Sequence, residues 1–171
     1  MVIIRLLFFL YLFFFIFTNT FAFTKQGKGT QSTGREDLSF LEAKNSNFKK
    51  GKDALKQALK LKKKNKFQKS NKRLNDSIKY FVEAYKENPN NVEVYNYLGL
   101  TYNYLGDFMM SEIYYREGLS IEPKNNLLNF RLGVLYSKTK RIDQAKERLD
   151  ILGACNCEEY LDLKKIIIDS K

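Results

Sequence analysis

Residues 91–124 read NVEVYNYLGLTYNYLGDFMMSEIYYREGLSIEPK, and this stretch determines the fold class. The same kinds of side chain return with a fixed period on both sides of it. The recurring positions are Leu74, Phe108 and Ile142; Ser77, Ser111 and Ala145; Phe81, Tyr115 and Leu149; and Pro89 and Pro123. A period of 34 in a helical sequence predicts stacked helix-turn-helix units.

Within the stretch, large apolar side chains recur every three or four residues, which is typical of amphipathic helices. Gly106 and Asp107 separate a helix predicted over residues 92–105 from a second predicted over residues 108–121. Pro123 ends the second helix, because proline cannot continue a helix. The same pattern predicts further helices over residues 74–87, 127–139 and 142–152.

Specific residues of this stretch match a known repeat pattern. They are Tyr95, Leu98, Gly99, Tyr102, Gly106, Phe108, Ser111, Tyr115, Gly118 and Pro123. In these residues the chain resembles the tetratricopeptide-repeat (TPR) family, and more loosely small exported bacterial TPR proteins. The resemblance implies an all-α fold, a short TPR α-solenoid of about three helix-turn-helix repeats followed by a C-terminal capping helix.

The resemblance divides residues 51–157 into three repeats, over residues 51–90, 91–124 and 125–157. The third departs from the family pattern at Asn129, Lys140 and Cys157. In the first repeat the second helix is in register, but its first helix matches only when the register moves back by seven residues, which places Ala58 at the small-residue position. We therefore predict a seven-residue insertion within residues 62–73, forming an exposed connection between the two helices.

The segments outside the repeats have distinct compositions. Residues 1–22 combine Arg5, the apolar run of residues 6–17 and small residues near position 22, which predicts a secretory signal peptide. The alternative is an uncleaved membrane anchor over residues 2–23. Residues 23–50 are rich in Gly, Ser, Thr and Asn and are predicted to be a polar tether. Residues 158–171 are predicted to form a capping helix, because a terminal repeat has no neighbour to cover its apolar face.

A signal peptide predicts an exported protein, in the periplasm if the source is bacterial. The alternative location is a membrane, to which residues 2–23 would anchor the chain if they are not cleaved. Both locations permit disulfides.

The positive charge is concentrated in one segment. The whole chain has a formal net charge of +11, and residues 49–73 hold 12 Lys or Arg against Asp53 alone, so this segment accounts for all of the excess. It is either a functional patch for anionic lipid or another polyanion, or an ordinary solvated surface. Nucleic acid is not an expected partner, because Phe67 is the only aromatic residue there and single-strand binders use several for stacking.

The chain contains no histidine, and its two cysteines are Cys155 and Cys157. They can form a structural disulfide or remain buried thiols, take part in an intermolecular or redox-labile bond, or bind a metal. No metal site is predicted, because zinc sites usually have four ligands. Without histidine there is no Ser-His or Cys-His pair, and the sequence has no glycine-rich phosphate loop, so we expect neither an enzyme nor a cofactor.

The resemblance to the TPR family implies a concave groove, lined by the first helix of each repeat, that binds a protein or peptide partner. It places eight candidate binding residues there: Asn96, Leu100, Asn103, Tyr104, Phe130, Arg131, Val134 and Lys138. The family's clamp for acidic chaperone tails has Lys and Asn where this chain has Asn96 and Leu100, so that particular ligand is not predicted. Alternatively, Leu100, Phe130 and Val134 only pack against neighbouring helices.

Overall fold

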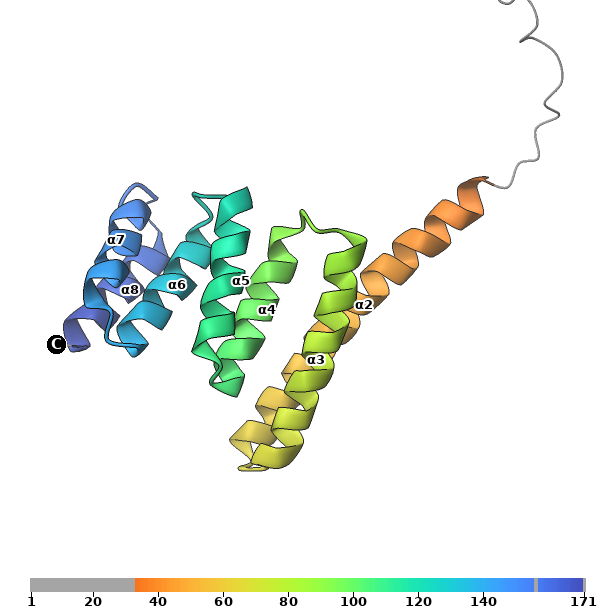
Figure 1. The fold of residues 1–171 in the computed structure, drawn as a ribbon, viewed down its shortest axis with the longest axis horizontal. Coiled ribbons are helices and arrows are strands. Elements are labelled where there is room, and N and C mark those ends of the chain that lie inside the picture. The colour runs from red at the N-terminus through yellow and green to blue at the C-terminus, as the bar shows by residue number, and fades with distance from the viewer. Residues whose placement is uncertain (1–32, 156, 171) are drawn as a thin grey trace, which may run out of the picture. The chain divides into compact units, whose positions relative to one another are not determined.

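The computed structural model describes residues 33–155 and 157–170. This part of the chain contains seven α-helices and no strand, which confirms the predicted all-α repeat fold (Figure 1). The helices are α2 (Thr33–Lys63), α3 (Phe67–Glu87), α4 (Val92–Leu105), α5 (Phe108–Ile121), α6 (Asn126–Lys138), α7 (Ile142–Leu152) and α8 (Glu158–Asp169). Residues 1–37 and 38–171 form two separate units, and the repeats belong to the second. None of the described helices combines the length and the apolarity that a membrane-spanning segment needs.

The helix ends follow from local sequence chemistry. The side chains of Asn91 and Asn125 cap α4 and α6, each accepting a hydrogen bond from a free backbone N–H of the first turn. Gly106 follows α4 with φ of 87°, a left-handed conformation that glycine adopts without strain. Lys140 adopts φ of 63° at the equivalent turn of the next repeat. The turn geometry of the third repeat is therefore retained although its glycine is absent.

Successive helices pack in pairs, α4 on α5 and α6 on α7, and the pairs contact one another in chain order. The pairs approach closely where a glycine faces a large side chain. A Cβ added to Gly99 would lie 2.4 Å from the ring of Tyr115, so any larger residue there would displace that ring. At the C-terminal end, α8 packs on α6 and α7 and buries Leu163 and Ile167. Leu163 occupies the space beside Gly133, so α8 covers the apolar face of the last repeat.

The first helical pair corrects the predicted insertion. Helix α3 has 21 residues against 14 in α5, and it begins seven residues before Leu74, the position equivalent to the start of α5. On the partner helix, Gly51 rather than Ala58 faces the equivalent ring position, because a Cβ on Gly51 would lie 2.6 Å from Phe81. The insertion is therefore twice as long as predicted, and it lengthens both helices by two turns instead of forming a connection between them.

The added turns are joined by paired small residues. Ser77 Oγ donates a hydrogen bond to Gly51 O, and Ser70 Oγ donates one to Ala58 O, both at 2.9 Å. Both pairs are buried, and the residues within each helix are seven apart. The same close contact is thus made twice along the hairpin. The turn at its end, residues 64–66, includes Asn65 with φ of 56°.

The predicted polar tether is also partly wrong. Helix α2 begins at Thr33, so residues 33–50 are helical, while residues 23–32 lie outside the described residues. The physical reason is visible at Phe48, whose ring centroid lies 5.7 Å from that of Phe81 and 5.4 Å from that of Tyr97. Burial of this ring against α3 and α4 stabilises the helical turn that precedes Gly51.

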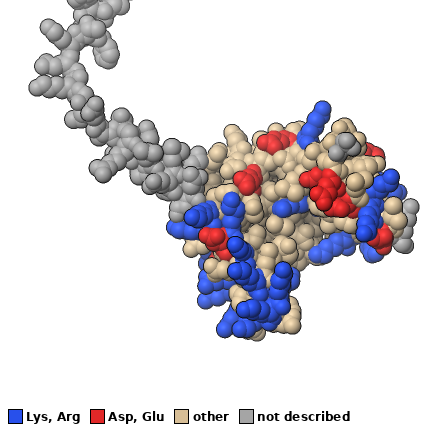
Figure 2. Space-filling view, turned by 180° about the vertical axis from the view of Figure 1, so that it is seen from behind, with Lys and Arg blue, Asp and Glu red and all other residues tan. Residues whose placement is uncertain are grey.

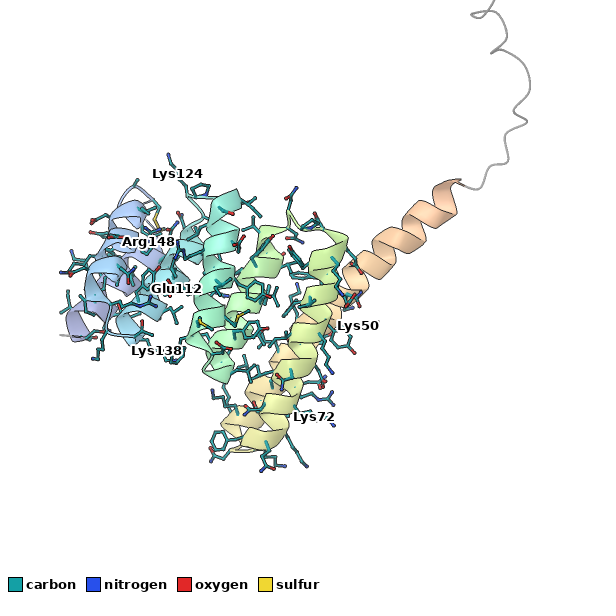
Figure 3. The ribbon with its side chains drawn as sticks, viewed as in Figure 1. Lys50, Lys72, Glu112, Lys124, Lys138 and Arg148 are labelled. Carbon is teal, nitrogen blue, oxygen red and sulfur yellow. A yellow bond between two sulfur atoms is a disulfide. The ribbon has the colours of Figure 1, made fainter. Side chains whose placement is uncertain are left out.

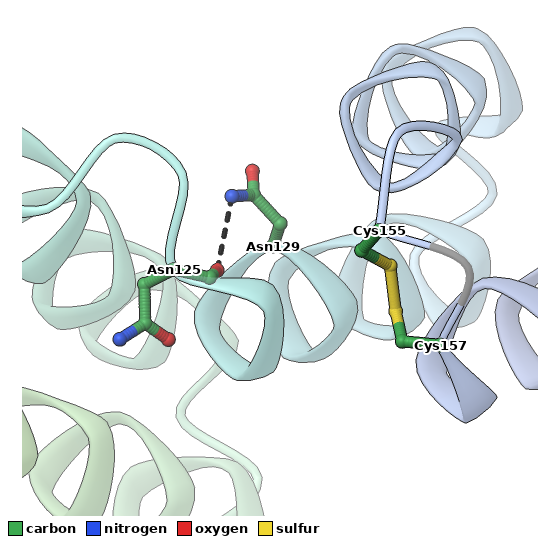
Figure 4. Close-up of a disulfide and its surroundings, with 4 residues drawn as sticks. All are labelled: Asn125, Asn129, Cys155 and Cys157. Atoms are coloured by element: carbon green, nitrogen blue, oxygen red, sulfur yellow. Dashed lines mark hydrogen bonds between the residues drawn. A yellow bond between two sulfur atoms is a disulfide. The ribbon is translucent and has the colours of Figure 1, made fainter.

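The third repeat retains its contacts despite its unusual residues. Tyr95 OH donates a hydrogen bond to Pro89 O, and Asn129, at the equivalent position of the next repeat, donates one from Nδ2 to Pro123 O. Asn129 thus replaces the aromatic residue but keeps its bond to the proline carbonyl, and it donates a second bond to Asn125 O (Figure 4). Cys155 and Cys157 form a disulfide with a Cα–Cα distance of 5.2 Å in the turn before α8.

Candidate functional site

Helices α4 and α6 are the first helices of the second and third repeats, and they contact each other directly. They carry all eight predicted groove residues, four on each helix. Asn96, Leu100, Asn103 and Tyr104 lie on α4, and Phe130, Arg131, Val134 and Lys138 lie on α6. We call the surface between them the α4–α6 face.

Two hydrogen bonds join the polar residues of the α4–α6 face. Arg131 Nη1 donates to Asn96 O at 3.4 Å, and Lys138 Nζ donates to Asn103 Oδ1 at 3.2 Å. Lys138 lies at the end of α6, with its ammonium group 4.4 Å from the ring centroid of Phe108 (Figure 3). The structure therefore pairs Lys138 with the side-chain amide of Asn103, whereas Arg131 contacts the backbone carbonyl of Asn96 rather than its side chain.

The apolar residues of the face contribute mainly to packing. Leu100 is half-buried against the apolar cluster of the first hairpin, and Phe130 and Val134 are half-buried against the core of the third repeat. Tyr104 is more exposed, at 36%, and its carbonyl accepts a hydrogen bond from Lys62 Nζ at 3.2 Å. A third cation, contributed by α2, thus lies beside the C-terminal end of α4.

Some buried polar atoms of α4 and α5 have no hydrogen-bond partner among the described residues. They are Asn96 Oδ1, Ser111 Oγ and Tyr115 OH. Burial raises the pKa of Tyr115 above its usual value of 10.0, although the charge of Arg131 and the nearby polar groups of Ser111 and Asn103 act in the opposite direction. These groups lie near the Tyr115 hydroxyl, but none of them has the geometry of a hydrogen bond to it. The pattern of apolar positions predicted only packing for Ser111 and Tyr115. The sequence does indicate that packing at this position needs no hydroxyl, because the residue equivalent to Tyr115 in the first repeat is Phe81.

A cleft of about 430 Å³ lies at the N-terminal ends of α4 and α6. Asn96 borders it, and so do two carboxylates, Glu93 and Glu122. Glu122 Oε2 accepts a hydrogen bond from Asn125 Nδ2 at 2.7 Å. The remaining lining residues are Asn88, Asn90, Asn91, Val92, Asn125 and Leu127. This end of the face is therefore acidic and rich in amides, whereas the opposite end carries Lys62 and Lys138.

The predicted disulfide residues lie outside this face, in the turn before α8. In the described part of the chain, no cluster of three or more Cys, Asp or Glu side chains has the arrangement of a metal site. The arrangement of the α4–α6 face suits recognition of another molecule by hydrogen bonds and charge.

Helical pairs stacked in series, the first two of them closed by a glycine against an aromatic ring, define a helical-repeat protein. Residues 80–112 match a family model described as Tetratricopeptide repeat. The chain therefore contains tetratricopeptide repeats in a TPR fold. A search of curated protein sequences finds no significant match.

Solved TPR domains have the same fold at low sequence identity. The TPR domain of Arabidopsis OM64 aligns with a TM-score of 0.53 and 17% identity, covering 73% of this chain and 99% of that domain. The TPR2B domain of yeast Sti1, solved as a complex with pHsp70, aligns with a TM-score of 0.54 and 14% identity, covering 71% and 95%. The first TPR domain of Spaghetti (RPAP3), bound to the HSP90 peptide SRMEEVD, aligns with a TM-score of 0.52 and 17% identity, covering 71% and 94%.

Proposed function

We propose that the α4–α6 face binds an extended segment of a partner protein. The observation that supports this most strongly is Asn96 Oδ1, a buried side-chain atom without a partner that belongs to a residue lining the cleft. A buried polar group that forms no hydrogen bond costs about 1–3 kcal/mol, and a backbone N–H of a bound peptide would supply the missing partner. The peptide complexes of the Sti1 and RPAP3 domains support binding by the same fold.

The charge distribution gives the bound segment a direction. Glu93 and Glu122 border the cleft at one end, and Lys62 and Lys138 lie at the other. Helix α4 has 14 residues and is therefore about 21 Å long, which matches roughly six residues of extended chain. The ligand would place a basic residue or an amino group at the cleft and an acidic residue beside Lys138.

This role is binding without catalysis. The full chain has no histidine, so any acid–base chemistry would depend on other groups. Position 96 is asparagine and position 100 is leucine, so the ligand need not be one of the chaperone tails bound by the similar domains.

A displayed library of random peptides tests the proposal. We expect selection on the wild-type protein to enrich peptides with an acidic residue at a fixed position. Lys138→Glu should reverse that preference, and Asn103→Ala should weaken selected peptides by about tenfold, the loss of one hydrogen bond to a ligand. Lys165→Glu, an exposed substitution on α8, is the matched control and should bind as wild type does. Enriched peptides that bind Lys138→Glu and Asn103→Ala as tightly as wild type would show that another surface binds them.

We also propose that the protein is exported and acts in a bacterial envelope assembly in the periplasm, either free or anchored by residues 2–23. The support is the composition of residues 1–22, which lie outside the described residues. Cell fractionation followed by intact-mass measurement tests this. We expect an envelope fraction with Phe23 as the first residue if cleavage occurs. An intact chain found only in the cytoplasm would contradict export.

A further inference from the structure

The lengthened hairpin of α2 and α3 forms an arm that we define as residues 56–73. It extends beyond the turn between α4 and α5 because each of its helices has two additional turns (Figure 1). The paired contacts of Gly51 with Ser77 and of Ala58 with Ser70 hold the two helices together as far as the arm. The arm is therefore a stiff projection, since both of its helices continue into the packed first repeat.

Positive charge covers the end of this arm. Nine Lys or Arg lie between positions 56 and 73, and no acidic residue lies between Asp53 and Asp76. Figure 2 shows the resulting blue surface at the end of the projection. Every residue from 62 to 69 is exposed, and Arg73 alone among the nine forms a salt bridge within the described structure, with Asp76. Such crowding of like charges is unfavourable unless an anionic partner offsets it.

An apolar side chain lies among these cations. Phe67, the first residue of α3, is 55% exposed and directly follows the turn of residues 64–66. On the same arm, a cleft of about 590 Å³ has Leu61 on its wall and the cations Lys60, Lys69, Lys72 and Arg73 around it. The end of the arm therefore combines a protruding aromatic ring with basic groups that surround an apolar surface.

We propose that the end of the arm docks on a bilayer that contains anionic phospholipids. The lysines contact headgroup phosphates, and Phe67 enters the interface between headgroups and acyl chains. A flat anionic surface is complementary to cations placed around the end of a projection. Single-stranded nucleic acid fits less well, because it is bound along a groove with several aromatic residues, and the arm has only Phe67.

The rest of the chain gives this docking its selectivity. Outside residues 49–73 the basic and acidic residues balance, so electrostatic attraction to a membrane acts mainly through the arm. Each lysine near an anionic bilayer strengthens binding roughly fivefold. Lys62 is the one residue of the arm that also borders the candidate peptide site, whereas Lys63, Lys64, Lys66 and Phe67 belong to the end of the arm alone.

The absence of tryptophan from the sequence provides a direct test in the full-length chain. In Phe67→Trp the single indole reports the environment of the arm's end. We expect its emission to shift to shorter wavelength with vesicles of phosphatidylcholine and phosphatidylglycerol, but not with phosphatidylcholine alone. The N-terminal apolar segment can bind to both kinds of vesicle. That binding does not place residue 67 in lipid, so it does not change the emission of the indole. Met109→Trp on α5 is the reporter control, because the side chain of Met109 is 70% exposed and lies outside the arm. The emission of this variant should not shift.

Charge substitutions complete the test. Replacing Lys63, Lys64 and Lys66 together with Gln should weaken binding to anionic vesicles about a hundredfold. The matched control replaces the exposed Lys79, Lys124 and Lys165 with Gln, which gives the same net charge and should leave binding within a few-fold of wild type. Helical circular dichroism should be retained in both variants, because all six side chains are exposed.

Three results would overturn the proposal. The first is an emission of the Phe67→Trp variant that is equal with anionic and neutral vesicles. The second is a control variant that loses as much binding as the arm variant. The third is an emission shift of the Phe67→Trp variant with a single-stranded oligonucleotide and none with anionic vesicles.

Discussion

The ring of Phe81 occupies the space that any side chain on Gly51 would need, since a Cβ there would lie 2.6 Å from Phe81 Cε1. Tyr115 has the same relationship to Gly99 in the next repeat. These contacts set the distance between the two helices of each pair.

Gly51→Ala should therefore destabilise the protein. Alanine favours a helix by about 1 kcal/mol over glycine, but the forced movement of the buried Phe81 ring costs about 2–3 kcal/mol, so we expect a net loss of about 1–2 kcal/mol. Urea unfolding followed by circular dichroism measures this. Gln57→Ala, exposed on the same helix, should change the free energy of unfolding by less than about 0.5 kcal/mol. Equal stability of Gly51→Ala and wild type would show that the helices separate without cost.

Tyr115→Phe should not destabilise the protein. The Tyr115 hydroxyl is buried without a partner among the described residues, so its removal should leave stability unchanged or raise it by up to about 1 kcal/mol. Thermal unfolding measures this change.

Tyr95→Phe is the contrasting control, because its hydroxyl donates a hydrogen bond to Pro89 O at 2.6 Å. It should lose about 1 kcal/mol of stability. If Tyr115→Phe were destabilised equally, its hydroxyl would have a protein partner after all.

Glu112 links the second and third repeats and should make stability depend on pH. Its Oε2 lies 2.7 Å from Arg141 Nη2, and its Oε1 accepts a hydrogen bond from Tyr136 OH (Figure 3). Burial alone raises the pKa of the Glu112 carboxyl, but the hydrogen bond and charge of Arg141 outweigh burial and hold the pKa below 4.5.

A carboxyl with a lowered pKa in the folded state stabilises the fold above its unfolded pKa, and this contribution is lost as pH falls through the folded value. Glu112→Gln should therefore cost about 1–3 kcal/mol at neutral pH, and the difference from wild type should shrink below pH 4.5. Urea unfolding at a series of pH values measures it. A difference that is constant across the acid range would mean that the charge of Glu112 contributes nothing.

Reduction of the Cys155–Cys157 disulfide should lower stability only modestly. The bond closes a loop of three residues, for which the entropic model gives roughly 1–2 kcal/mol. Thermal unfolding with and without a reductant measures the change in the wild type. The double variant Cys155→Ser/Cys157→Ser should not respond to reductant. A wild type that is also insensitive would indicate that the bond does not constrain the unfolded chain.

The sequence predicted the repeat fold because small and large residues return at a period of 34, as at Gly99 and Gly133 and at Phe81 and Tyr115. It could not set the length of the insertion in the first repeat. Seven residues return a helix to nearly the same face, so Gly51 and Ala58 fit the small-residue position equally well in the pattern. Only the position of the Phe81 ring distinguishes them.

The sequence predicted which helices carry the candidate residues but not how these residues pair, and their role in binding stays a prediction. The family register placed Asn96 and Asn103 on α4 and Arg131 and Lys138 on α6, and the structure pairs them. For the hydroxyl of Tyr115 the one indication was Phe81 at the equivalent position of the first repeat, because hydrogen bonding itself depends on distances between helices. Sequence periodicity reports only which side of a helix is buried.

The paired small residues of the first hairpin have an evolutionary consequence. Adding or removing seven residues in both helices at once would change the reach of the projection by about 10 Å while rotating each helix by only about 20°. Relatives could therefore differ in how far this projection extends from the remaining repeats, while their ligand specificity evolves independently.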